Sequence, residues 1–335
     1  MNACASRFKL SHLLVAAVAI FIAPLQAIAQ QPATSVAFPT KLVKIVVPFG
    51  PGGALDLVSR LIAEQLAVKW GQPVIVENKA GANGAIGIDY VAKSPPDGYT
   101  LISVPATNLV INPHLYAKLP YDPFKDLEPI TTLVSVPNIL VVNAAVPAKS
   151  LKDLIALAKA KPEELTYSSP GPGSQAHLAS EYLNGVAGIK IRHIPYNGIG
   201  KALQSVVGGE VTMMFAQIQA ATPFVQAGKV RPLAIATLKR SSLMPDLPTL
   251  VESGLPDFEA VTWNALMAAP GTPPQIVAKI QADVAAILHS PEVEAKLVVA
   301  GTEPVGNTSE QLAAQITDEY KRYGDLIRRF NIKID

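Results

Sequence analysis

Apolar and polar positions alternate along the chain between two patterns, short apolar runs and longer stretches with helical spacing. Lys44 to Val47 is an apolar, β-branched run, which predicts a buried strand. Further on, Leu57, Leu61 and Leu66 lie near one face of a predicted helix. The prolines and glycines of 48–53 break both patterns. The chain therefore opens with a strand, a glycine-rich loop and a helix.

The same alternation continues through the first hundred residues. Strands are predicted over Pro73–Val76 and Tyr99–Val104, with a small-residue helix over Ala85–Lys93 between them. Pro95 to Gly98 is a turn. Alternating strands and helices predict a parallel sheet with helices on its faces.

A second set of strand–loop–helix units follows a long apolar run. Ile130 to Val142, interrupted at Pro137, predicts two strands that cross into a second domain. Thr166 to Ser169 then begins a strand that ends in a Gly/Pro/Ser loop before a helix, as at the start of the chain. Further strands are predicted at 191–194, 211–215 and 232–237. A helix ending at Val207 follows the strand at 191–194, and a helix ending at Gly228 follows the strand at 211–215.

The last third predicts a return to the first domain. A strand over Phe258–Met267 is followed by helices over 273–289, 291–299 and 309–329. We predict an α/β fold with domain 1 at 41–137 plus 259–335 and domain 2 at 138–258. Two α/β domains joined by two crossing strands, with a ligand cleft between them, describe a two-lobed periplasmic binding protein of the type II kind.

The N-terminus predicts export. Arg7 and Lys9 precede a short apolar core, and Ala27-Ile28-Ala29 fits a cleavage site, so residues 1–29 are predicted to be a signal peptide and 30–40 a solvated leader. The single cysteine, Cys4, lies in the signal. No later stretch is long and apolar enough to span a bilayer. We expect a soluble protein in the periplasm.

Charge argues against polyanionic partners. The chain has 28 basic and 26 acidic residues, and removal of Arg7 and Lys9 with the signal leaves the two classes equal. No long run of like charge occurs, so neither nucleic acid nor an anionic membrane surface is an expected partner.

The glycine-rich loops are the candidate sites. A loop that ends at a helix N-terminus exposes main-chain N–H groups, which favour an anion such as a carboxylate. The alternative is a plain tight turn between strand and helix, which uses the same residues. The local sequence leaves both interpretations open.

Seven ordered motifs resemble the solute receptors of tripartite tricarboxylate transporters, often called Bug proteins. They are VPFGPGGALD (47–56), VENKAGANG (76–84), PDGYT (96–100), QAHLA (175–179), PYNG (195–198), GGEV (208–211) and LPTLVESGLP (247–256). The resemblance extends from Lys44 to about Ile332.

This resemblance implies a receptor that binds a small carboxylate and delivers it to membrane subunits of the transporter, as a monomer with no cofactor or metal. The loops of both lobes would grip the carboxylate, and three further segments would complete the wall. The implied ligand-binding residues are Phe49, Gly52, Gly53, Ala54, Asp56, Thr107, Asn108, Ser169, Gly171, Gly173, Ser174, His177, Tyr196, Asn197, Gly198, Ala216 and Gln217.

Two departures from the family pattern bear on the ligand. Relatives often carry acidic residues where Ala216 stands and near Ser205, and this chain has none there. An amino-acid ligand would want a counter-charge for its ammonium group. A dicarboxylate or an aromatic carboxylate is therefore favoured.

Several residues have a second interpretation. Asp56 is either a ligand-facing group or a carboxylate that pairs with Arg60 one helical turn later. His177 is either a ligand-facing donor or a packed, hydrogen-bonded histidine. The histidines lack metal-ligand spacing, so no zinc site is expected.

Two other functions compete with the receptor. A periplasmic hydrolase would use Ser174 or Ser169 with His177, but the sequence lacks the nucleophile-elbow pattern around Ser174. A sensor that reports the ligand to a membrane kinase would use the same binding chemistry as a transport receptor. We expect no enzyme activity.

Overall fold

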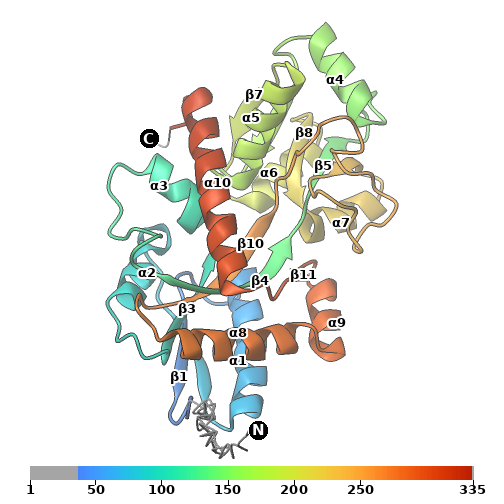
Figure 1. Ribbon diagram of the computed structural model, residues 1–335. Coiled ribbons are helices and arrows are strands. Elements are labelled where there is room, and N and C mark those ends of the chain that lie inside the picture. The colour runs from blue at the N-terminus through green and yellow to red at the C-terminus, as the bar shows by residue number, and fades with distance from the viewer. Residues whose placement is uncertain (1–36, 334–335) are drawn as a thin grey trace, which may run out of the picture. The chain divides into compact units, whose positions relative to one another are not determined.

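A computed structural model describes residues 37–333, which form two β-sheets flanked by helices (Figure 1). The predicted signal peptide at 1–29 and most of the leader lie outside the described residues. The expectation of a solvated leader is wrong at Phe38, which is 6% exposed and packs on Trp70 and Tyr99. An aromatic side chain there gains more from burial than from contact with water.

The first lobe is built on a six-stranded sheet with the order β11-β4-β10-β3-β1-β2. Strand β1 pairs in parallel with β2 and β3, as the alternation of strands and helices predicts. Strands β10, β4 and β11 complete the sheet with antiparallel pairings. The strands are β1 (Val43–Val47), β2 (Val74–Asn78), β3 (Thr100–Pro105), β4 (Glu128–Val136), β10 (Thr262–Ala268) and β11 (Glu303–Pro304).

Helices predicted on the faces of this sheet are present. They are α1 (Ala54–Trp70), α2 (Ala85–Ala92), α8 (Pro274–Leu288), α9 (Pro291–Val299) and α10 (Ser309–Arg329). The C-terminal helices return to the first lobe as predicted, since α8 and α10 both pack on β4. Helix α10 begins at a capping box in which Thr308 and Gln311 exchange hydrogen bonds.

The segment after β3 differs from the prediction. The sequence analysis predicts no helix there, yet a π-helical turn at Thr107–Ile111 leads into the short helix α3 (Asn112–Leu115). Pro113 lies in the first turn of α3, where main-chain N–H groups have no acceptor within the helix. A proline there therefore loses no helical hydrogen bond. This segment places several polar side chains beside the cleft described below.

The second lobe has a five-stranded sheet with the order β7-β6-β8-β5-β9. Strand β6 pairs in parallel with β7 and β8, while β5 runs antiparallel to β8 and β9. Its strands are β5 (Asn138–Asn143), β6 (Thr166–Ser169), β7 (Arg192–Pro195), β8 (Met213–Gln217) and β9 (Val230–Ile235). Its helices are α4 (Leu151–Ala160), α5 (Gln175–Ala187), α6 (Ile199–Val207) and α7 (Ile218–Gln226).

The two sheets share one scheme, three parallel strands followed by antiparallel ones. The chain leaves the first sheet at Pro137, between β4 and β5, and returns to it at β10. Each sheet has its own apolar core, but Leu178 of α5 belongs to the core of the first lobe. Helix α10 reaches from β4 to α5 and so contacts both lobes (Figure 1). The domain boundaries in residue numbers stay a prediction.

Candidate functional site

A cleft of about 320 Å³ lies between the lobes, at the carboxyl ends of β3, β6 and β8. Leu115 and polar side chains of the first lobe, including that of Thr262 at the start of β10, line one side of this cleft. The loop after β6 lines it from the second lobe. The lining residues are Asn83, Thr107, Asn112, Leu115, Tyr116, Asn138, Pro170, Gly171, Pro172, Gly173, Ser174, Gln175, Ala176, Ile199, Phe215, Gln217 and Thr262.

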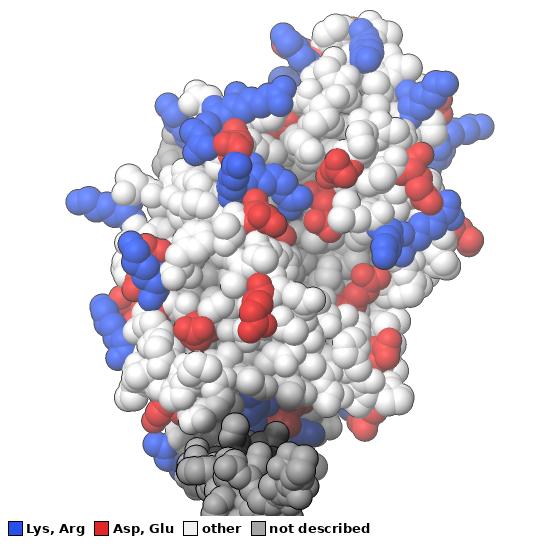
Figure 2. Space-filling view, in the orientation of Figure 1, with Lys and Arg blue, Asp and Glu red and all other residues white. Residues whose placement is uncertain are grey.

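The lining of this cleft is polar but uncharged. It contains amides, hydroxyls and apolar groups, and among the described residues that line it there is no Asp, Glu, Lys, Arg or His. Charged side chains of both signs are instead interspersed over the outer face shown in Figure 2. A ligand anion in the cleft would therefore be held by neutral donors and dipoles.

The loop after β6 presents the N-terminus of α5 to the cleft. Ser174 is the N-cap: its hydroxyl accepts from the N–H of His177 and donates to the carbonyl of Gly171 at 2.7 Å. Gly173 has φ +74°, a left-handed conformation that suits glycine. Helix geometry leaves the N–H groups of Gln175 and Ala176, both in the lining, without helical acceptors. These donors and the helix dipole favour an anion.

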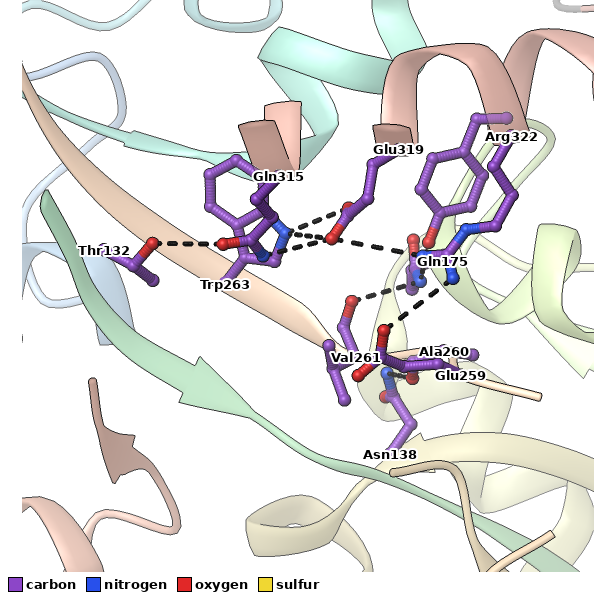
Figure 3. A network of polar contacts seen from close by, with 11 residues as sticks. Thr132, Asn138, Gln175, Glu259, Ala260, Val261, Trp263, Gln315, Glu319 and Arg322 are labelled. Atoms are coloured by element: carbon purple, nitrogen blue, oxygen red, sulfur yellow. Dashed lines mark hydrogen bonds and ion pairs between the residues drawn. The ribbon is translucent and has the colours of Figure 1, made fainter. Parts of the chain in front are cut away.

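Two of the lining residues, Asn138 and Gln175, belong to a polar network that joins both crossing segments to α10 (Figure 3). Asn138 donates to the carbonyl of Ala260 at 2.8 Å. Gln175 donates to the carbonyl of Val261 at 3.2 Å and to the hydroxyl of Tyr323 at 2.6 Å. Burial raises the pKa of Tyr323 to about 12, so its hydroxyl stays protonated at neutral pH.

One glutamine of the wall is available as a donor. Gln219 Nε2 donates to Gln217 Oε1 at 3.3 Å, which leaves the Gln217 amide nitrogen for the cleft. Gln219 also lies against Gly301 of the first lobe, where an added Cβ would come within 2.4 Å of the Gln219 Cβ. The wall at Gln217 thus adjoins a contact between the lobes.

The cleft brings together some of the residues expected from the sequence. Thr107, Gly171, Gly173, Ser174 and Gln217 line it. The remaining expected residues do not: Phe49, Gly52, Gly53, Ala54, Asp56, Asn108, Ser169, His177, Tyr196, Asn197, Gly198 and Ala216.

Several of these remaining residues lie close behind the lining. Asn108 donates to the carbonyl of Asn83 at 2.7 Å and so supports a lining residue. Tyr196 donates its N–H to Ser169, and Gly198 donates to Pro170 in the loop after β6. Ala216 is fully buried in β8.

The loop after β1 is solvent-exposed, and its helix N-terminus already faces a carboxylate. Asp56 is only 2% exposed and accepts from the N–H of Gly52 at 3.0 Å, from Arg60 and from Asn78. The bonds from Arg60, with further bonds from Gly52 and Asn78, lower the pKa of Asp56 to about 2 despite its burial. Of the two interpretations of Asp56, the structure shows the one in which its carboxylate pairs with Arg60.

His177 takes its packed alternative in a stack of rings behind the loop. Its Nδ1 accepts from the N–H of Gly173 at 3.0 Å, and its ring lies 4.1 Å from that of His193. Burial lowers the pKa of both histidines to about 4, and for His177 the neighbouring His193 adds to the effect. The ring of Tyr167 also stacks on His193, with the ring centroids 4.8 Å apart.

A serine–histidine contact exists, but it differs from the one considered in the sequence. Ser169 Oγ lies 2.7 Å from His193 Nε2, whereas the Ser174 hydroxyl is engaged as a helix cap. Ser169 is fully buried and lies outside the cleft lining. Among residues 37–333, no group of three or more His, Cys, Asp or Glu could hold a metal ion, and no helix there is both long and apolar enough to cross a membrane.

The sequence interpretation missed the amides of the cleft. Asn83, Asn112, Asn138 and Gln175 are lining residues that it did not select. Two of them had a local signal: Asn138 follows the proline at the predicted crossing, and Gln175 follows the N-cap serine. Asn83, in the loop after β2, and Asn112, after the turn that follows β3, had no such signal. Only the tertiary structure places them at the cleft.

Comparison with known proteins gives consistent matches. Residues 58–332 match the sequence profile of the tripartite tricarboxylate transporter family receptor. Protein BugT of Bordetella pertussis is 37% identical over 322 residues, covering 96% of this chain and 98% of BugT. A structure from R. palustris with adipate has 35% identity and TM-score 0.74, covering 88% of this chain and 99% of its own. MatC from Rhodopseudomonas palustris with bound malate has 35% identity and TM-score 0.69, covering 87% and 100%. These matches confirm the resemblance and, with the two sheets, the predicted fold class.

Proposed function

The chain belongs to the tripartite tricarboxylate transporter family receptors, and on that premise we propose that it captures a small carboxylate outside the cytoplasmic membrane and delivers it to the membrane subunits of such a transporter. The adipate and malate in the two related structures support this ligand class. The N-terminal signal predicted from the sequence supports a periplasmic location. Monomeric action is part of the proposal.

One observation carries the proposal. The cleft is uncharged, yet it presents the N–H groups of Gln175 and Ala176, the Gln217 amide and the dipole of α5 to a single region. Main-chain donors at a helix N-terminus stabilise a carboxylate without a formal counter-charge. Neutral recognition of this kind also lets the ligand leave again when the lobes separate.

The loop after β1 enters the proposal through hinge closure. Its glycines are exposed and lie outside the cleft lining. The chain crosses between the lobes at Pro137 and in the segment before β10, and rotation about such crossings is how two-lobed receptors close. Closure would bring the N–H groups at Gly53 and Ala54 toward the carboxylate held by α5.

Binding without turnover is expected. The Ser174 hydroxyl is engaged as a cap, and Ser169 is buried away from the cleft beside a histidine that has no carboxylate partner among its hydrogen bonds in the described chain. A nucleophile needs an accessible oxygen and an oriented base. Purified protein should therefore leave ester substrates unchanged.

The test is a thermal-shift screen of the mature chain against mono- and dicarboxylates, followed by calorimetry on the best ligand. A ligand that binds only the folded state increases the free energy of unfolding by RT ln(1 + [L]/Kd), which is about 2.7 kcal/mol at one hundred times Kd, and so raises the melting temperature. We expect a clear shift with a subset of carboxylates. Equal melting curves across the whole panel would contradict carboxylate capture.

A further inference from the structure

Two amides on the cleft wall are held in one orientation by consecutive main-chain carbonyls. Asn138 Nδ2 donates to Ala260, and Gln175 Nε2 donates to Val261. A carbonyl oxygen only accepts, so the amide nitrogen, not the amide oxygen, must face it. Gln175 uses its second N–H on the Tyr323 hydroxyl (Figure 3). Its oxygen is then the polar atom that this side chain can offer a ligand.

Neither amide oxygen is fully sealed from solvent. In the described chain, the sealed side-chain polar atoms without a partner are Ser103 Oγ and Gln219 Oε1. The oxygens of Asn138 and Gln175 accept no hydrogen bond from the described residues and are not among those sealed atoms, so they reach solvent. Both residues line the cleft. This part of the wall therefore presents acceptors that await a donor.

Among the described residues that line the cleft, no Lys or Arg is present to neutralise a second negative group. The cation drawn nearest to Gln175 in Figure 3 is Arg322, which lies 3.7 Å from Glu259 and 4.0 Å from Glu319. Its charge is offset by these two carboxylates. A second carboxylate on the ligand would face amide oxygens and lose water without gaining a partner.

From these contacts we infer that the ligand carries one carboxylate and an uncharged hydrogen-bond donor such as a carboxamide or a hydroxyl. Gln175 is the residue that determines this specificity. The inference rests on the proposed function, in which the N-terminus of α5 and Gln217 hold the single carboxylate. It narrows the two ligand classes expected from the sequence toward half-amides and hydroxylated or carbamoylated aromatic acids.

The test compares matched pairs in which one carboxylate is replaced by a carboxamide of nearly the same shape. The pairs are succinate and succinamate, adipate and adipamate, and terephthalate and 4-carbamoylbenzoate. Calorimetry on the mature protein gives both dissociation constants for each pair. We expect the half-amide to bind at least about tenfold more tightly in the pair of best-fitting length, because a site with buried polar groups rejects an analogue that cannot pair with them.

Variants assign the preference to Gln175. In Gln175→Met the acceptor is removed, and the ratio of the two constants should fall to about threefold or less. The matched control is Gln315→Met, the same substitution in the same network but outside the cleft, where Gln315 contacts Thr132 and Glu319. This control should keep the wild-type ratio. The wild-type ratio itself needs no variant, so the inference stays testable if Gln175→Met does not fold.

The outcomes separate the two proposals. If dicarboxylates bind as tightly as their half-amides or more tightly, the inference is overturned while carboxylate capture stands. A ratio that Gln175→Met leaves unchanged would also overturn the role of Gln175. If no member of any pair binds to the folded protein, carboxylate capture fails, and the inference fails with it.

Discussion

The two glycine-rich loops share a strand–loop–helix pattern but differ in what occupies the helix N-terminus. After β6, the neutral Ser174 caps α5, and the loop lines the cleft. After β1, Gly53 offers no side-chain cap to α1, and the buried Asp56 carboxylate accepts from Gly52 in the loop. One helix N-terminus is thus left for an external anion, while the other already has an internal one.

This difference shows that a glycine-rich loop is not sufficient to define an anion site. Helix N-termini favour negative charge whether it comes from a ligand or from the chain itself. Asp56 is held by Arg60 and Asn78 and cannot be displaced cheaply. The loop after β1 can therefore contribute N–H groups to a shared ligand, but it is a weaker isolated site than the loop after β6.

The strongest test turns the second loop into a copy of the first. Ser174→Asp places a carboxylate at the N-cap of α5, where Asp caps about as well as Ser. Carboxylate binding should weaken by about a hundredfold or more, since like charges would then share one helix N-terminus. Calorimetry measures this, with the uncharged Ser174→Asn as control. If both variants bind equally, the α5 N-terminus is not the anion site.

The ring stack behind the second loop should make stability depend on mildly acidic pH. His177 has a folded pKa of about 4 against an ordinary 6.5, so the unfolded state binds more protons between these values. Stability is then lost as pH falls through this window, by about 2 kcal/mol at pH 5 for this histidine. Urea unfolding from pH 7 to pH 5 measures the loss. Because burial lowers the pKa of His193 as well, His177→Gln should remove only the part of the loss that His177 contributes, whereas the exposed His289→Gln should leave the profile unchanged.

The contribution of the first loop can be tested at Gly53, where a side chain has room. A Cβ there would have no atom within 4 Å, and φ is −76°, so Gly53→Val should fold normally. We expect binding to weaken by about tenfold, because the side chain would keep the N–H groups of the loop from a ligand in the closed state. Gly50→Val, at an equally open position, is the control. If Gly53→Val binds the carboxylate with unchanged affinity, the loop after β1 does not contact the ligand.

The smallest expected effect concerns the internal anion of the first loop. The folded pKa of Asp56 is about 2, below its ordinary 3.8. Its contribution to stability is present above pH 3.8 and is lost as pH falls toward 2. Because Arg60 is half exposed, Asp56→Asn should lower the free energy of unfolding at pH 7 by only about 1 kcal/mol. Chemical denaturation at pH 7 and pH 3 measures the difference in free energy of unfolding between the wild type and Asp56→Asn. A difference that is larger at pH 3 than at pH 7 would contradict a lowered pKa for Asp56.

Much of the fold could be predicted because its signals are local. The apolar run before Pro48 gives β1, and a helix, α1, follows the glycine-rich loop as predicted. The predicted leucine face is wrong at Leu57, which is 59% exposed, because the buried face of α1 carries Val58, Ile62 and Leu66. The parallel pairing of β1 with β2 and β3 follows from the alternation of elements. The turn at Thr107–Ile111 was missed because a π-helical turn has no distinctive spacing of apolar residues.

The site was predicted less completely than the fold. The loop after β6 has glycine, proline and serine in a recognisable order, and it does line the cleft. The amides at Asn83 and Asn112 look like any other asparagine in the sequence. Their role depends on which surfaces face each other across the lobes, and that is a property of distant segments.

The sequence by itself determined the alternation of elements, the two loops and the family, because strand and helix periodicity and turn chemistry act over a few neighbouring residues. The tertiary structure alone decided that the cleft is uncharged and that the amide of Gln175 is fixed by Val261 and Tyr323, 86 and 148 residues away. Hydrogen-bond direction and charge balance are set by partners brought together in space, which no local pattern encodes.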